Sequence, residues 1–136
     1  MTAKDAEAVN ALSKQLGYPL SVGETVQNIN AVLQTKDRTA FVAEYENKIV
    51  GWIGAAQTLM IEVMPHCEIN GLVIDEHHRG MGIGKLLTDK VKLWAREKGN
   101  DKIGLHCNVN RTEAHLFYQH LGFKELKQQK NFVINI

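Results

Sequence analysis

The sequence predicts an α/β fold, a mixed sheet flanked by helices, on three observations. Helical apolar spacing dominates residues 4–35, whereas β-branched and aromatic residues dominate residues 39–59. Residues 67–109 then have the pattern of a strand, a crossover helix and a second strand. Because hairpin-linked strands are antiparallel and strands joined by a crossover helix are parallel, the predicted sheet has strands in both directions.

The first half of the chain divides into two helices and a hairpin. A helix over 4–16 carries apolar residues at helical spacing and ends before Gly17, and a second helix over 22–35 places its apolar residues on one face. Residues 39–59 are predicted to form two antiparallel strands that turn at Asn47-Lys48.

The parallel unit is predicted from residue 67 onward. A strand over 67–74 is followed by a glycine loop and by a helix over about 83–97, which has apolar residues at i, i+4, i+7 and i+8 and a natural stop at Gly99. A strand over 102–109 alternates apolar residues with residues of other types, so it has two unlike faces.

The end of the chain is predicted to form one more helix and two short strands. Asn110 and Glu113 have the spacing of a capping box at the start of that helix, which Gly122 ends. The strands are expected at roughly 123–128 and 132–136.

Composition limits the function classes. The chain has 136 residues, enough for one domain over 1–136, and its formal charge of +1 supplies no field for nucleic acid or an anionic membrane. We expect a cytoplasmic protein, because the sequence lacks an apolar run of roughly 18 residues and a signal peptide. Cys67 and Cys107 lie in strand-like segments without a C-x-x-C unit, which favours reduced core thiols over a disulfide or a catalytic thiol.

The stretch HHRGMGIGKLL, residues 77–87, has a glycine at every second position. These glycines are Gly80, Gly82 and Gly84. They follow a strand and precede a helix, where backbone N–H groups without partners and the helix dipole attract an anion, and Arg79 and Lys85 add positive charge. The alternative is a tight turn that needs glycine for positive φ. Neither the dinucleotide fingerprint nor the nucleoside-triphosphate P-loop fits the spacing.

The remaining pattern, Arg79-x-x-Gly82-x-Gly84 after a strand, resembles the pyrophosphate loop of the GNAT superfamily of acyl-CoA-dependent N-acyltransferases. INGLVIDEHHRGMGIGKLL resembles that family's strand, loop and helix in order, and NVNRTEAHLFYQHLGF resembles its later segment. Together with the two predicted helices over 4–16 and 22–35 and the hairpin, the resemblance covers nearly the whole chain.

The resemblance implies a GNAT-like fold: a mixed, mostly antiparallel β-sheet with a central splayed parallel strand pair, flanked by about four helices. Family members usually have a strand before the first helix, so either that strand lies outside this sequence or the sheet is one strand short. Dimerisation is common in the family, and a homodimer is compatible with the sequence, which marks no interface.

The resemblance also implies acetyl-CoA as the cosubstrate, with its pyrophosphate on the loop amides and its pantetheine arm along the first parallel strand. It assigns these positions to the coenzyme: Leu72, Val73, Ile74, Arg79, Gly80, Met81, Gly82, Ile83, Gly84, Lys85, Asn110, Ala114 and Phe117. His77 and His78 are expected to flank the phosphates, and no metal is expected, because the histidines lack chelating helical spacing.

Two residues are candidates for the proton transfers of acetyl transfer. Tyr118 occupies the position where many family members carry the tyrosine that protonates the coenzyme A sulfur; the alternative is a core aromatic residue. Glu68 occupies the offset at which some members keep a general base; the alternative is a solvated carboxylate. Asn70 stands where other members place their glutamate, which leaves the base open among Glu68, Asn70 and water.

The implied activity is N-acetylation of a primary amine on a small molecule. One alternative is a catalytically inactive coenzyme A-binding or sensory module, which would not need Tyr118 as an acid. Another is a protein or peptide N-acetyltransferase, which requires an acidic groove that the few acidic residues do not demonstrate. The acceptor is expected among residues 16–24 and Trp52, and its identity is not readable from the sequence.

Overall fold

The computed structural model describes residues 1–136, which fall into two compact units, residues 1–105 and 106–136. The first unit contains a sheet with the strand order β1-β2-β3-β4. Its elements are η1 (Ala3–Asp5), α1 (Ala6–Gln15), α2 (Val22–Leu33), β1 (Arg38–Tyr45), β2 (Lys48–Thr58), β3 (His66–Ile74), η2 (Glu76–His78), α3 (Ile83–Glu97) and β4 (Ile103–Leu105). β1, β2 and β3 pair antiparallel and β3 and β4 pair parallel, which confirms the predicted mixed sheet.

Polar bonds tie α1 to α2. Asn10 is buried on α1, and its Nδ2 donates to Thr25 Oγ1 at 3.0 Å and to the Leu20 carbonyl at 2.6 Å. α2 begins at a capping box in which Ser21 Oγ accepts from the Glu24 N–H and the Glu24 carboxylate accepts from the Ser21 N–H. The bond from the Ser21 backbone is the main reason that the pKa of Glu24 lies below its usual range. The connection between the helices is therefore fixed at both ends.

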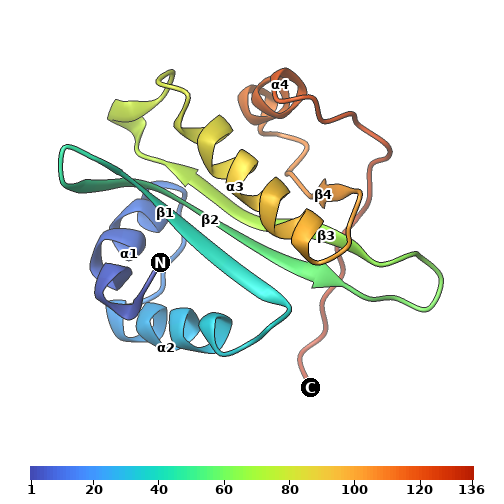
Figure 1. The fold of residues 1–136 in the computed structure, drawn as a ribbon, viewed down its shortest axis with the longest axis horizontal. Coiled ribbons are helices and arrows are strands. Elements are labelled where there is room, and N and C mark those ends of the chain that lie inside the picture. The colour runs from blue at the N-terminus through green and yellow to red at the C-terminus, as the bar shows by residue number, and fades with distance from the viewer. The chain divides into compact units, whose positions relative to one another are not determined.

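The two faces of the sheet are covered by different helices (Figure 1). Val42 and Trp52, which pair across β1 and β2, pack against buried side chains of α1 and α2. Successive side chains of a strand point to opposite faces. Phe41, next to Val42, accordingly lines a shallow depression with Trp94 of α3. α3 thus packs on the face opposite to α1 and α2.

The β1–β2 turn and α3 lie close to their predicted places. Glu46 and Asn47 form the turn, with φ angles of 49° and 63°. The turn thus lies one residue earlier than predicted, because Lys48 already belongs to β2. α3 covers the predicted residues 83–97, and Gly99 follows it in the left-handed conformation.

The parallel pair β3–β4 is shorter than predicted. Only Cys67–Ile69 of β3 pair with Ile103–Leu105, so the strand predicted over 102–109 is reduced to β4. β3 continues to Ile74 without a strand on its β4 side. Residues 70–74 consequently have backbone groups at an open edge of the sheet.

The second unit contains α4 (Thr112–His120). The predicted capping box is not formed: Arg111 is the N-cap and no side chain caps the helix, while Asn108 Oδ1 accepts from the Asn110 N–H at 2.9 Å. The strands predicted at 123–128 and 132–136 are also absent from this structure. Polar and charged side chains fill most of 124–130, and an isolated extended segment without a pairing partner gains no ladder hydrogen bonds.

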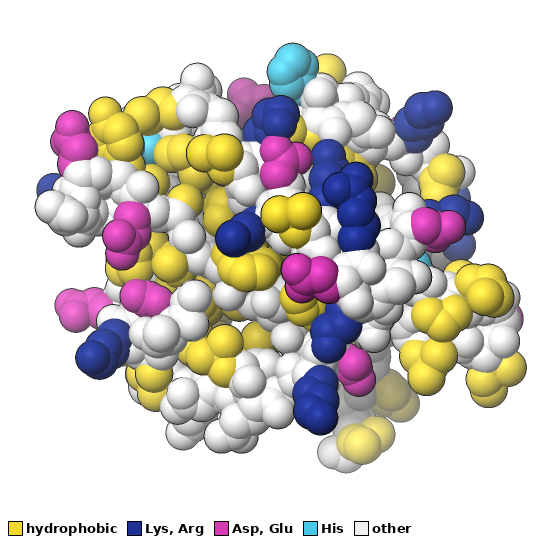
Figure 2. Space-filling view, in the orientation of Figure 1, with side chains coloured by type: hydrophobic (Ala, Val, Ile, Leu, Met, Phe, Trp, Pro, Cys, Tyr) yellow, Lys and Arg dark blue, Asp and Glu magenta, His cyan; other side chains and the backbone are white.

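The connection between β2 and β3 is an exposed apolar segment of the first unit. It spans residues 59–65 and exposes Leu59, Ile61 and Met64 almost fully. Hydrophobic side chains gather at the lower right of Figure 2, where Figure 1 places this connection. None of the helices combines the length and the apolar character needed to cross a lipid bilayer.

Candidate functional site

The glycine loop between η2 and α3 has an open backbone. Gly80 and Gly82 adopt φ angles of +77° and +80°, which side chains other than glycine rarely adopt. No heavy atom lies within 4 Å of the position that a Cβ would take at either glycine. Arg79, Gly80, Met81 and Gly82 are all exposed. The glycines therefore serve the turn and also leave the surrounding space free for a ligand.

The N-terminus of α3 is not capped by any side chain. Its N-cap is Gly82, and the first helical hydrogen bond runs from the Leu86 N–H to the Gly82 carbonyl at 3.1 Å. The amides of residues 83–85 precede that bond and have no acceptor within the helix. α2 differs, because Ser21 caps its first turn. The start of α3 thus offers N–H groups and a positive dipole end to an anion.

The basic residues predicted at this loop have different environments. Lys85 Nζ lies 2.7 Å from Asp89 Oδ2, one turn further along α3, and Lys92 lies 3.5 Å from the other oxygen of Asp89. Figure 2 shows this face of the molecule, with acidic side chains among the Lys and Arg side chains. Arg79 is exposed and forms no ion pair, so its guanidinium is available to a ligand without breaking an existing contact.

The residues predicted to line the coenzyme arm contribute backbone rather than side chains. Val73 is buried. The side chain of Ile74 packs against Gly51 of β2, and so does the side chain of Ile83 of α3. Leu72, the residue before Val73, is half-buried. A ligand along the open edge of β3 would therefore meet peptide groups, which are the donors and acceptors that a parallel strand would otherwise use.

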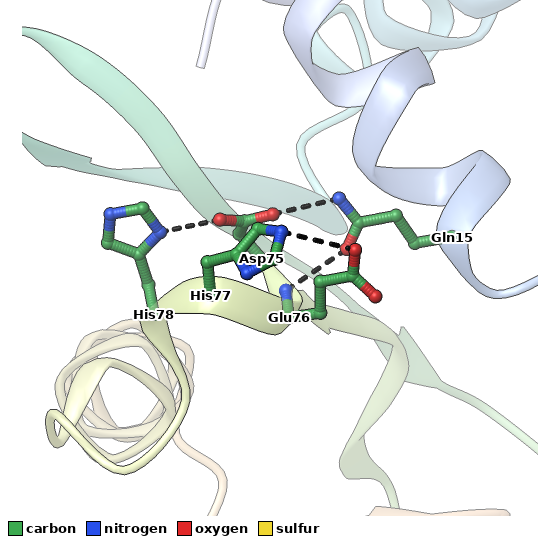
Figure 3. Close-up of polar contacts among 5 residues, drawn as sticks. All are labelled: Gln15, Asp75, Glu76, His77 and His78. Atoms are coloured by element: carbon green, nitrogen blue, oxygen red, sulfur yellow. Dashed lines mark hydrogen bonds and ion pairs between the residues drawn. The ribbon is translucent and has the colours of Figure 1, made fainter.

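A polar network holds the end of β3 to the end of α1 (Figure 3). Gln15 Nε2 donates to Asp75 Oδ1 at 2.8 Å, and Gln15 Oε1 accepts from the Glu76 N–H at 3.1 Å. His78 Nδ1 lies 2.5 Å from Asp75 Oδ2. The hydrogen bonds from Gln15 and then from His78 are the main reasons that the pKa of Asp75 lies below its ordinary value.

The structure distinguishes the two histidines that were predicted to flank the phosphates. The His77 side chain is 81% exposed and only approaches Glu76, at 3.4 Å. His78 is held by Asp75, and the Tyr45 ring stands against it at a centroid distance of 5.7 Å. The i, i+3 spacing of Asp75 and His78 is a local signal for this pair. Gln15 lies 60 residues away in the sequence, and no local pattern reveals its part.

The candidate base lies on the sheet of the first unit. Glu68 pairs with Ala56, and its Oε2 accepts from Thr58 Oγ1 at 3.1 Å. Asn70 is the extra residue of a bulge in β3, with Oδ1 2.8 Å from the position of a Cβ on Gly54. Ala56 and Gly54 are two residues apart on β2, so Glu68 and Asn70 point to the same face.

The candidate acid and the remaining predicted positions belong to the second unit. Tyr118 lies on α4, with ring contacts to Phe117 at 5.3 Å and to Phe123 at 6.0 Å. Asn110 precedes the helix and is exposed, and Ala114 lies in its first turn. The aromatic contacts hold the Tyr118 ring in place.

Cys67 does not provide a nucleophile. It is fully buried on β3, and burial, followed by the neighbouring Glu68 carboxylate, raises its pKa to about 11. A thiol with this pKa is protonated at neutral pH and is a weak nucleophile.

Comparison with known proteins places this geometry in a family. The sequence profile described as acetyltransferase (GNAT) family matches residues 7–123. The uncharacterized N-acetyltransferase YhdJ of Bacillus subtilis is 32% identical over 127 residues, which are 90% of this chain and 88% of YhdJ. Human N-acetyltransferase 8B is 36% identical over 92 residues, and these cover 65% of this chain and only 39% of that longer protein.

Solved structures show the same fold at low sequence identity. The aminoglycoside N-acetyltransferase AAC(6')-Iy in complex with CoA matches with a TM-score of 0.89 and 20% identity, over 100% of this chain and 92% of the other. The same enzyme in complex with a bisubstrate analogue, CoA-S-monomethyl-acetylneamine, gives a TM-score of 0.88.

Proposed function

This chain belongs to the GNAT family of N-acetyltransferases, and from that premise we propose that it transfers the acetyl group of acetyl-CoA to a primary amine of a small molecule. The observation that carries the proposal is the N-terminus of α3, where a glycine N-cap leaves the amides of residues 83–85 without helical partners. The pyrophosphate of coenzyme A is an anion of the kind that such amides bind.

A second feature of the first unit also supports coenzyme binding. Residues 70–74 of β3 have an open edge, whose peptide groups suit the amides of a pantetheine arm. Arg79 supplies a free positive charge beside the loop, whereas Lys85 would have to leave Asp89 to do so. We therefore assign the phosphate contacts to the loop amides and Arg79, with Lys85 as a secondary contact.

The chemistry moves three protons. The ammonium form of the acceptor first loses a proton. The neutral amine nitrogen then attacks the thioester carbonyl and loses a second proton to solvent as the amide forms, the carbon–sulfur bond breaks, and the departing thiolate takes up a proton. We assign the last step to Tyr118, because its place in the later segment matches the position of the family's acid. Glu68, directly or through water, is assigned the removal of a proton from the ammonium form of the acceptor.

The preference for a small amine is supported by the structural neighbours, which include an enzyme solved with CoA and with an aminoglycoside-derived bisubstrate analogue. The α1–α2 connection adds apolar and aromatic surface, because Tyr18 and Leu20 are both exposed there. We place the acceptor beside this connection. Trp52, also expected near the acceptor, is half-buried and packs against the core of α1 and α2.

The proposal is tested by incubating the protein with acetyl-CoA and a panel of primary amines while free thiol is followed with a chromogenic disulfide. We expect thiol release that depends on one class of amine, with an acetylated product of matching mass. A reaction without amine measures hydrolysis. Binding of acetyl-CoA without transfer to any amine, protein tail or peptide would instead support the coenzyme-binding module.

A further inference from the structure

The last turn of α1 is not held in place by burial. The buried side chains of this helix are those of Ala6, Val9, Asn10 and Leu12. None of residues 13–15 is buried, and Gln15, the last residue of the helix, is exposed. The connection to α2 starts directly after Gln15. Because little side-chain burial restrains this end of α1, its polar contacts determine how firmly it is positioned.

Gln15 joins this end of α1 to the turn that follows β3 (Figure 3). Its Nε2 donates to Asp75 Oδ1 at 2.8 Å, and its Oε1 accepts from the Glu76 N–H at 3.1 Å. A glutamine amide is both a donor and an acceptor, so one side chain binds a carboxylate and a backbone group at the same time. The end of α1 is therefore attached at two points to residues 75 and 76.

The turn that Gln15 binds is itself anchored to the sheet. The Asp75 N–H donates to the Val50 carbonyl of β2 at 2.8 Å, and the Asp75 side chain is only 16% exposed. The His78 N–H donates to the Asp75 carbonyl at 2.9 Å and closes the turn. Residues 75–78 lie between the end of β3 and the loop that begins at Arg79, the two segments assigned to the coenzyme. A ligand bound to both segments would restrain this turn from both sides.

We infer that Gln15 is a positioning residue for the acceptor side of the site: it fixes the end of α1, and with it the connection over residues 16–21, to the turn that coenzyme binding restrains. This inference rests on the proposed function, in which the coenzyme lies along β3 and the loop and the acceptor lies beside the connection. Because coupling between two binding sites is reciprocal, each substrate raises the affinity for the other by the same factor.

The other polar contacts of the connection stay within the pair of helices. Asn10 Nδ2 donates to the Leu20 carbonyl and to Thr25 Oγ1, and Ser21 caps α2. These contacts hold the connection to α1 and α2, and they do not reach β3. They persist without Gln15, so we expect its loss to loosen the connection and leave the fold intact. The competing explanation is that Gln15 only stabilises the turn at Asp75.

The experiment follows backbone amide hydrogen exchange of the full chain by NMR, with and without saturating coenzyme A. The amides of residues 16–18 report on the end of α1, because they donate to the carbonyls of Ser13 and Lys14. The amides of Gln34 and Thr35 end α2 in a similar way and provide the reference in the same spectra. In the wild type we expect coenzyme A to slow exchange at residues 16–18 by about two- to tenfold relative to this reference, the range that one ordinary hydrogen bond provides.

Gln15→Leu removes both contacts and keeps a residue that favours a helix. Coenzyme A should still bind this variant, since the turn keeps its bond to Val50, but exchange at residues 16–18 should no longer slow on binding. Gln27→Leu is the matched control, because it makes the same substitution at an exposed position of α2, and it should behave as the wild type.

Steady-state kinetics provide the functional measurement. The probe is the amine that gives the fastest thiol release in the panel, with acetyl-CoA saturating. Gln15→Leu should raise the KM for this amine by about two- to tenfold and leave kcat nearly unchanged, because the contact positions the acceptor side and takes no part in the chemical step.

The outcomes separate the two proposals. If the wild type binds neither coenzyme A nor acetyl-CoA, the proposed function fails. If coenzyme A binds but exchange at residues 16–18 stays unchanged in the wild type, or slows equally in Gln15→Leu, the positioning role of Gln15 is wrong; the wild-type measurement needs no variant and no amine. A variant with weaker acetyl-CoA binding and an unchanged KM for the amine would assign Gln15 to the turn alone and also overturn the inference.

Discussion

Gly71 of β3 lies against the indole ring of Trp52: a Cβ at position 71 would stand 2.5 Å from Cη2 and 2.6 Å from Cζ3 of that ring. Trp52 in turn packs against the buried side chains shared by α1 and α2. Gly71 pairs with Gly54 of β2, so two facing glycines leave room for a large aromatic residue on this face of the sheet. The packing of α1 and α2 on the sheet therefore depends on Gly71, which makes room for the Trp52 ring although it lies 19 residues away in the sequence.

Gly71→Ala is expected to destabilise the protein by about 1–3 kcal/mol, because an added methyl group would force the ring or the strand to move in a packed core. Chemical denaturation measures the loss. Gly104→Ala on β4 is the control, since its methyl group would meet only His66 Cδ2 at an ordinary 3.8 Å. Equal stability of the two variants would show that Trp52 can move without cost.

Gly82→Ala is expected to weaken acetyl-CoA binding and also to lower stability by about 1–2 kcal/mol, because a side chain is strained at φ +80° and would stand among the loop amides. Gly99→Ala at the other end of α3 has the same strain, at φ +81°, with no heavy atom within 4 Å. Calorimetry should find reduced affinity only in Gly82→Ala, while both lose stability alike. Equal affinities would mean that Gly82 serves the turn alone.

The hydrogen bonds from Gln15 and His78 to Asp75 make the free energy of unfolding depend on pH in a definite direction. The ordinary pKa of this carboxyl is 3.8, and the folded value is lower, mainly because of Gln15. The unfolded chain therefore binds the proton first on acidification. The stabilisation is present above about pH 4 and is lost as the pH falls through the folded pKa.

Gln15→Leu should raise the pKa of Asp75 toward its ordinary value, as followed by carbon-13 NMR of the carboxyl group. The pKa of Asp89 is lowered mainly by Lys85 and provides the control within the same spectra, since Gln15 does not contact it. An unchanged Asp75 titration would show that His78 alone holds the carboxylate.

Local sequence signals were sufficient to predict the elements whose ends are marked by neighbouring residues. α3 was predicted over about 83–97 and spans Ile83–Glu97, because its apolar spacing and the glycines on both sides mark one helix whatever surrounds it. The hairpin and β3 were likewise readable from β-branched runs. The glycine loop before α3 was readable from the sequence, and Gly82 is the N-cap of α3 without a side-chain cap; phosphate binding by this loop stays a prediction.

Features that depend on distant partners were not predictable. The period-two pattern over 102–109 indicates where a strand can form, whereas its length depends on how far β3 stays beside it, and pairing stops at Leu105. The bond between Gln15 and Asp75 joins α1 to β3 and has no local pattern. Lys85 had the right charge for a phosphate, but an aspartate one helical turn away competes for it.

Glu68→Gln is expected to lower turnover most at acidic pH, by up to about 10²-fold, because the acceptor is then an ammonium whose proton must be removed. The affinity for acetyl-CoA should stay unchanged, and Thr58 can still donate to the amide oxygen of the variant. Glu44→Gln, an exposed change on β1, is the control. A pH–rate profile that superimposes on that of the wild type would remove Glu68 from the mechanism.

Tyr118→Phe is expected to lower turnover by at least about 10²-fold, the lower part of the range for general-acid help, because a thiolate that leaves without a proton is costly in a poorly hydrated site. The ring contacts with Phe117 and Phe123 do not need the hydroxyl, so the aromatic packing is kept and the affinity for acetyl-CoA should change little. Single-turnover rates with the best amine isolate the chemical step from product release. A variant that keeps the wild-type single-turnover rate would leave Tyr118 as an aromatic residue of the second unit's packing, and the thiolate would have to take its proton from water.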